Sequence, residues 1–129
     1  MIEKAKERLQ SFGYEWKNGD EAILTFSVQK AENTIKNDCN ISAVPEGLMN
    51  IAVDMVVGEF LMAKKAFAPD DISGLDLSTA VKQIQEGDTN ITFAAGEGSL
   101  TAEQRLDSFI NHLLTYGKGE FVHYRRLLW

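Results

Sequence analysis

The sequence predicts a mainly all-α protein, with four to five helices packed like a bundle around one long central helix, plus a short β-hairpin or extended arm. Apolar residues recur at steps of three and four along several segments, as they do in helices that bury one face. The 129 residues are enough for a single core, and 44% hydrophobic and 25% charged residues are typical of a folded globular chain. We therefore expect one domain over residues 1–129, ending in a tail over 119–129.

The first two helices are predicted over residues 2–12 and, roughly, 21–37. The first has one apolar stripe, and Gly13 should end it. Asp20 is placed to cap the second helix, because its carboxylate can accept hydrogen bonds from the free N–H groups of the first turn. The buried face of the second helix is predicted to comprise Leu24, Val28, Ala31 and Ile35, widened by Ile23 and Phe26.

The third and longest helix is predicted from about Pro45 to Phe67, which is roughly 30 Å at the usual rise per residue. It is apolar over most of its circumference, because several apolar residues fall off its main stripe: Val53, Val57, Leu61 and Met62. Such a helix should be buried on more than one side. We expect a neighbouring subunit to supply part of that burial, with Val57 and Leu61 as candidate contact residues.

An extended segment follows the third helix, at Gln83–Phe93. β-branched and aromatic residues near its end favour an extended chain, and Gly87 suits a turn. Because an isolated two-stranded ribbon is unstable, the segment should either lie on its own helices or pair with another chain. Both alternatives remain open, and the candidate subunit contacts are Thr89, Asn90, Ile91, Thr92 and Phe93.

The last helix should begin at a capping box formed by Thr101 and Gln104 and end at Gly117. The tail that follows is rich in aromatic, basic and apolar residues, of the types that dominate interface hot spots. Its final residues would be exposed on a monomer unless they fold back on the core or dock on a partner. The sequence leaves both possibilities open.

Charge and cysteine content narrow the classes of function. A net charge of −6 disfavours binding to nucleic acid or to anionic membranes. The most apolar stretch, Leu48–Ala68, includes Asp54, Lys64 and other polar residues that a simple membrane span would not carry. A lone cysteine, Cys39, and a charged N-terminal segment predict a protein of a reducing compartment without a secretion signal.

Catalytic chemistry has few candidates. Cys39 could pair with His112 or His123 as a thiol nucleophile and base, but it lies in no recognisable motif. We favour a partly buried structural Cys39, a helix-surface His112 and a His123 that makes packing or interface contacts. The sequence has no zinc, calcium or phosphate-loop spacing. We therefore expect no metal, no cofactor and no enzyme activity.

Several segments resemble phage and prophage head–tail connector proteins, the adaptor or head-completion proteins of siphophage type. Ile35–Ile41 and Val44–Leu48 resemble the junction at which one helix of that family ends and its long helix opens, and Ala52–Leu61 fits the same long helix. Ile84–Ala94 resembles a later segment, and Tyr124–Trp129 resembles the family's C-terminus. Leu128 stands where that terminus often has arginine, so a salt bridge or DNA contact there is in doubt.

The resemblance implies a structural subunit without catalytic residues. It implies a homo-oligomeric ring, of about twelve copies, in the virion neck between the portal protein and the stopper or tail-completion protein, with DNA passing through as cargo and no membrane contact. Assembly would take place in the host bacterial cytoplasm. The residues expected to dock on the portal are Tyr124, Arg125, Arg126, Leu127, Leu128 and Trp129. The alternative is a small helical adaptor or regulatory protein that binds another protein.

Overall fold

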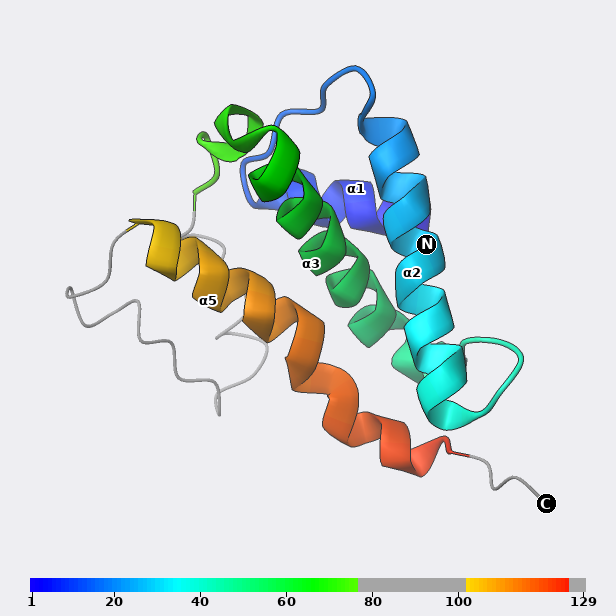
Figure 1. The fold of residues 1–129 in the computed structure, drawn as a ribbon. Helices are drawn as coiled ribbons and strands as arrows, with labels where there is room; N and C mark the ends of the chain where they lie inside the picture. Colours follow the sequence, from blue (N-terminus) through cyan, green and yellow to red (C-terminus); the bar gives the residue numbers. More distant parts are fainter. Residues whose placement is uncertain (77–101, 126–129) are drawn as a thin grey trace.

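The computed structural model describes residues 1–76 and 102–125 (Figure 1). The α-helices in these residues are α1 (Ile2–Ser11), α2 (Asp20–Cys39), α3 (Met49–Phe67) and α5 (Ala102–Thr115), joined by the short 3-10 helices η1 (Glu46–Leu48), η2 (Pro69–Ile72) and η4 (Tyr116–His123). The predicted mainly all-α, bundle-like fold is confirmed. The predicted arm at Gln83–Phe93 and the capping residue Thr101 lie outside the described residues.

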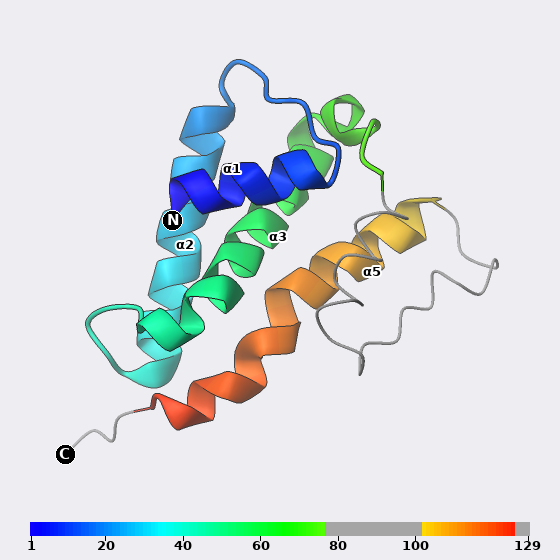
Figure 2. The same ribbon diagram turned by 180° about the vertical axis from the view of Figure 1, so that it is seen from behind.

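Helix α3 is the centre of the fold. Helices α1, α2 and α5 all pack against it, and Figure 2 shows α1 crossing one face of the α2–α3 pair. Of its four off-stripe residues, Val53, Val57 and Leu61 are buried, which confirms the expected burial on more than one side, whereas Met62 is 40% exposed. That burial comes from the chain itself, because α1 and α5 cover what α2 leaves open.

Aromatic side chains from the end of α1, from α3, from α5 and from η4 help to fill the core. Phe12, Phe60, Phe109 and Phe121 are all fully buried. The rings of Phe12 and Phe109 meet edge to face, with centroids 5.3 Å apart, and so tie the end of α1 to α5. Each side chain of this size contributes about 1.5–3 kcal/mol when it leaves water.

Helix α2 confirms the predicted buried stripe but corrects its width. Leu24, Val28 and the rest of the stripe are buried, whereas Phe26 is 66% exposed and Ile23 is half-buried. The prediction for Phe26 is wrong because, at 3.6 residues per turn, this position lies well away from the stripe. The helix continues to Cys39, and Asn40 ends it in the left-handed conformation, with φ of 55°.

The turns around α1 and α2 depend on glycine. Gly13 has φ of +90° and ends α1 as predicted, and the neighbouring Phe12 carbonyl accepts a hydrogen bond from the Asp76 N–H at 3.0 Å. Gly19, also at φ +90°, holds the N-cap position of α2 that the sequence analysis assigned to Asp20. Asp20 is instead the first residue of the helix, and its side chain makes tertiary contacts.

Two other helix boundaries also differ from prediction. Pro45 precedes the 3-10 turn η1, so α3 itself begins at Met49. Helix α5 ends at Thr115, and the chain continues as a 3-10 helix through Gly117 instead of stopping there. This continuation carries the C-terminal segment beneath α3 to the end of α2.

Candidate functional site

Three segments meet at one end of the bundle, where α2 ends, η1 begins and η4 passes beneath them (Figure 1). The Cys39 thiol, at the end of α2, donates a hydrogen bond to the Phe121 carbonyl oxygen of η4 at 3.7 Å. Both residues are fully buried. We call this region, defined by Cys39, Gly47, Gly117, Phe121 and Tyr124, the junction end.

Two glycines permit the close packing at the junction end. A Cβ atom on Gly47 would overlap the Tyr124 hydroxyl and lie 2.9 Å from its Cζ atom. A Cβ atom on Gly117 would lie 2.8 Å from Cγ1 and 3.0 Å from Cδ1 of Ile51 in α3. Real Cβ atoms do not approach carbon atoms so closely, so a Cβ atom at either position would have to displace Tyr124 or Ile51 from this packing.

Three of the segments that the sequence analysis singled out have residues at the junction end. Cys39 belongs to the segment Ile35–Ile41, Gly47 belongs to Val44–Leu48, and Tyr124 opens the C-terminal segment. Tyr124 is half-buried and packs on Gly47, whereas Arg125 is exposed. The structure thus brings two neighbouring segments of the chain, through Cys39 and Gly47, against the distant residues Phe121 and Tyr124. The remaining portal-docking candidates, at 126–129, lie outside the described residues.

The candidate subunit contacts on α3 need a correction. Val57 and Leu61 are fully buried in the core of their own chain, so neither offers surface to a second copy. The sequence pattern predicted that a second side of α3 would be covered, but a one-dimensional pattern does not distinguish α5 from a neighbour. The other contact candidates, at 89–93, are outside the described residues.

A buried polar cluster occupies the opposite end of the bundle. The Lys64 ammonium at the end of α3 lies 2.8 Å from Oδ1 of Asp20 and 2.6 Å from Oδ2 of Asp71. Oδ2 of Asp20 accepts hydrogen bonds from the Tyr14 hydroxyl and from the Lys17 backbone N–H, the latter at 2.9 Å. Asp20 and Lys64 are almost completely buried. We call Tyr14, Asp20, Lys64 and Asp71 the ion-cluster end.

The groups of this cluster shift one another's pKa values, so that Asp20 and Lys64 stay charged and Tyr14 stays neutral. Burial acts to raise the pKa of Asp20, but hydrogen bonds from Lys64, Tyr14 and the Lys17 N–H outweigh it, and the pKa is lowered. Burial likewise acts to lower the pKa of Lys64, and its hydrogen bonds to Asp20 and Asp71 reverse this and raise it. The pKa of Tyr14 is raised by burial and by Asp20. The cluster therefore consists of an ammonium, two carboxylates and a neutral phenol.

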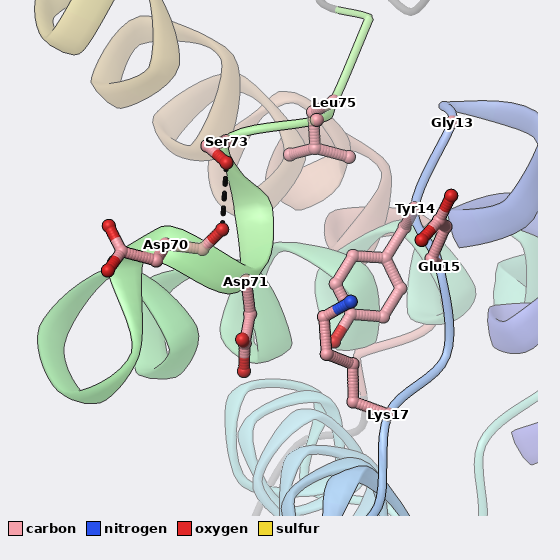
Figure 3. A pocket seen from close by; sticks show the side chains of 9 residues that line it. Gly13, Tyr14, Glu15, Lys17, Asp70, Asp71, Ser73 and Leu75 are labelled. Carbon is pink, nitrogen blue, oxygen red and sulfur yellow. Dashed lines mark hydrogen bonds between the residues drawn. The ribbon is translucent and has the colours of Figure 1, made fainter.

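A hollow of about 200 Å³ lies beside the cluster, between the loop after α1 and the η2 segment (Figure 3). Tyr14, Lys17 and Asp71 line it, and the Ser73 hydroxyl donates a hydrogen bond to the Asp70 carbonyl oxygen at 2.8 Å. The polar groups nearest the cluster are thus already engaged with one another. We interpret the hollow as the solvent-facing side of a cluster whose role is structural.

The arrangement gives no support to a Cys39 nucleophile. Burial, followed by the charge of Asp38, raises the pKa of the Cys39 thiol, whereas a nucleophile needs an accessible thiolate. His112 stacks on Tyr116 with ring centroids 4.8 Å apart, and the exposed His123 imidazole lies 4.0 Å from the Glu120 carboxylate. Cys39, expected to be partly buried, is completely buried.

Sequence reasoning missed a second buried carboxylate contact in the middle of α3. Asp54 is 7% exposed and accepts hydrogen bonds from Arg8 Nε of α1 at 3.0 Å and from the Tyr116 hydroxyl at 2.6 Å. Its position inside an apolar run was a usable signal, because a buried carboxylate needs partners. Nothing local in the sequence identified Arg8 or Tyr116 as those partners.

No protein-family model, curated protein or solved structure matches the chain. Within residues 1–76 and 102–125, no cluster of three or more histidine, cysteine or acidic side chains could hold a metal ion. In the same residues, no helix combines the length and the apolar character needed to cross a membrane.

Proposed function

We propose that the chain is a structural subunit of a head–tail connector ring in a tailed phage or prophage of siphophage type. It would sit in the neck between the portal and the stopper or tail-completion protein, pass DNA through its lumen and carry out no catalysis. The proposal rests on the sequence resemblance, and one structural observation supports it: Gly47 and Tyr124, from two of the segments that carry the resemblance, are in contact, and Cys39 from a third contacts Phe121, three residues before Tyr124.

The contacts at the junction end fit a docking role for the C-terminal residues. A docking segment binds more tightly when its starting point is held in one orientation, because less conformational entropy is lost on binding. Tyr124, packed on Gly47, holds the chain immediately before the exposed Arg125. The backbone is thereby held in place at Tyr124, immediately before the proposed docking residues.

The experiment uses the purified chain and the portal protein encoded by the same genome. We expect electron microscopy to show rings of the chain on the portal, and binding measurements to show at least about a 30-fold loss of affinity when Arg126–Trp129 are deleted. Lys4→Ala, a change of an exposed residue on α1, is the control and should bind as the unmodified chain does. Unchanged portal binding by the truncated chain would refute the docking assignment.

The same experiment separates the connector from a small helical adaptor. An adaptor is expected to remain a monomer or dimer and not to associate with the portal at any concentration. The connector is expected to form rings either alone or on the portal. A chain that forms no ring under either condition contradicts the proposed function.

A further inference from the structure

The 3-10 helix η4, Tyr116–His123, is unusually long. Its eight residues are about twice the usual run, because the hydrogen-bond geometry of a 3-10 helix is poorer than that of an α-helix. Two of its residues, Gly117 and Gly119, also lower the stability of any helical form. Contacts with the rest of the chain are therefore needed to fix the path of η4.

The contacts of η4, and of Tyr124 directly after it, follow α3 toward the start of that helix (Figure 1). Positions 116, 117 and 124 contact positions 54, 51 and 47, respectively. At 117 and 124 the contact is close packing that a glycine permits, and at 121 the backbone carbonyl accepts a hydrogen bond from the Cys39 thiol, which is a weak donor. Packing contacts and weak hydrogen bonds tolerate small shifts, so these three contacts do not by themselves select one register of η4 on α3.

The contact at position 116 is of a different kind. The Tyr116 hydroxyl donates a hydrogen bond to Oδ2 of Asp54 at 2.6 Å, and Asp54 is 7% exposed. Hydrogen bonds to charged groups are the strong ones, and they depend steeply on distance and angle. Thr115, directly before the bond, has φ of −121° and ψ of −24°, whereas an α-helix has φ of about −63°. The chain thus leaves the α-helical path at the residue before this bond, two positions before the predicted end at Gly117.

The burial of Asp54 also points to a role in register. Replacing a buried ion pair with apolar residues is often neutral or stabilising, and the best-attested use of such polar groups is to fix the register of packed elements. Arg8 Nε donates to Oδ1 of Asp54 at 3.0 Å, and Tyr116 donates to Oδ2. One carboxylate therefore ties α1 to α3 through Arg8 and ties the first residue of η4 to α3 through Tyr116.

We propose that Asp54, through the Tyr116 hydroxyl, sets the register of the C-terminal segment on α3. It is thereby a positioning residue for the docking residues that follow Tyr124. The docking consequence rests on the proposed connector function, whereas the register role does not depend on it.

The first test compares two variants of the full chain that each remove one partner of Asp54. Tyr116→Phe removes the hydroxyl and keeps the ring, and Arg8→Met removes the donor from α1. Nuclear Overhauser contacts between the Tyr124 ring and Gly47 report the register, and they should lose most of their intensity in Tyr116→Phe and persist in Arg8→Met. Arg8→Met should nevertheless lower the melting temperature more, because it removes the counter-charge of Asp54. Contacts that persist in Tyr116→Phe, or that weaken equally in both variants, overturn the proposal.

The second test measures binding to the portal. Tyr116→Phe should lose at least about tenfold in affinity, and Arg8→Met should change by less than about threefold. Asp54→Asn, whose amide oxygen can still accept from Tyr116, should bind more tightly than Asp54→Leu. Unchanged affinity of Tyr116→Phe, with the unmodified chain binding, overturns the positioning role and leaves the connector function standing. An unmodified chain that does not bind the portal overturns the connector function, and the Tyr124–Gly47 contacts then decide the register role alone.

Discussion

Different interactions stabilise the two ends of the bundle. At the ion-cluster end, Lys64 joins the start of α2 to η2 through two carboxylates in a buried setting. At the junction end, glycines at 47 and 117 let side chains of distant segments approach within van der Waals contact. One end depends on charge and hydrogen bonds, and the other depends on shape.

This difference predicts different sensitivities. Removing one charge from a buried cluster leaves its partner without compensation, which is among the costliest single changes in a protein. Adding a methyl group to a close-packed site costs less, and how much less depends on whether the neighbour can move. The ion-cluster end should therefore respond to charge and to pH, and the junction end should respond only to size.

The largest effect is expected for Lys64→Met. It removes the ammonium that pairs with both Asp20 and Asp71 while roughly keeping the side-chain volume, so Asp20 stays buried without this counter-ion. Urea unfolding should show a loss of about 3–5 kcal/mol in the free energy of unfolding. The double variant Lys64→Met/Asp20→Asn should recover part of that loss. A single variant as stable as the unmodified chain would show that the cluster contributes little.

Gly117→Ala should cost less, about 1–3 kcal/mol, because its Cβ atom would press on Ile51, which is itself packed against the core. The same unfolding measurement checks this. In an Ile51→Ala background the penalty of Gly117→Ala should shrink, because the opposing side chain is then shortened. Equal penalties in the two backgrounds would show that contact with Ile51 is not the cause.

The third-largest effect is expected in the pH dependence of the free energy of unfolding, which should differ between variants of the two ends. Asp20 has a folded-state pKa below its ordinary 3.8, so its contribution to stability is complete above that value and is lost as the pH falls through the folded pKa. Lys64 has a raised pKa, so its contribution is complete below 10.5 and is lost as the pH rises through the folded pKa. Unfolding curves in acid should therefore be less pH-dependent for Asp20→Asn. Gly117→Ala should keep the original pH dependence, and if it does not, the two ends are coupled.

The smallest effect on stability is expected for Gly47→Ala, within about 0.5 kcal/mol. Its Cβ atom meets the hydroxyl end of Tyr124, which can swing away at little cost. Portal affinity should nevertheless fall, because Tyr124 would no longer hold the chain before Arg125. In a Tyr124→Ala background, Gly47→Ala should change neither quantity. A large loss of stability in the single variant would contradict the prediction that the Tyr124 side chain gives way to the added Cβ atom.

Sequence reasoning succeeded where the determining interactions are local. The spacing of Leu24, Val28 and Ala31 identified the buried stripe of α2, and Gly13 identified the end of α1, because helical period and turn geometry act within a few residues. It failed for Asp20, whose local position resembles a cap but whose partner Lys64 is 44 positions away. It also failed for Phe26, which was grouped with the stripe because it is apolar.

The sequence by itself determined that the chain is helical and that α3 is buried on more than one side. Only the tertiary structure decided that α5 and not a neighbour covers Val57 and Leu61, that Arg8 and Tyr116 meet Asp54, and that Gly47 meets Tyr124. The physical reason is the distance along the sequence over which each property is set. Periodicity and burial cost are properties of short stretches, whereas these pairings depend on how helices far apart in the sequence pack together.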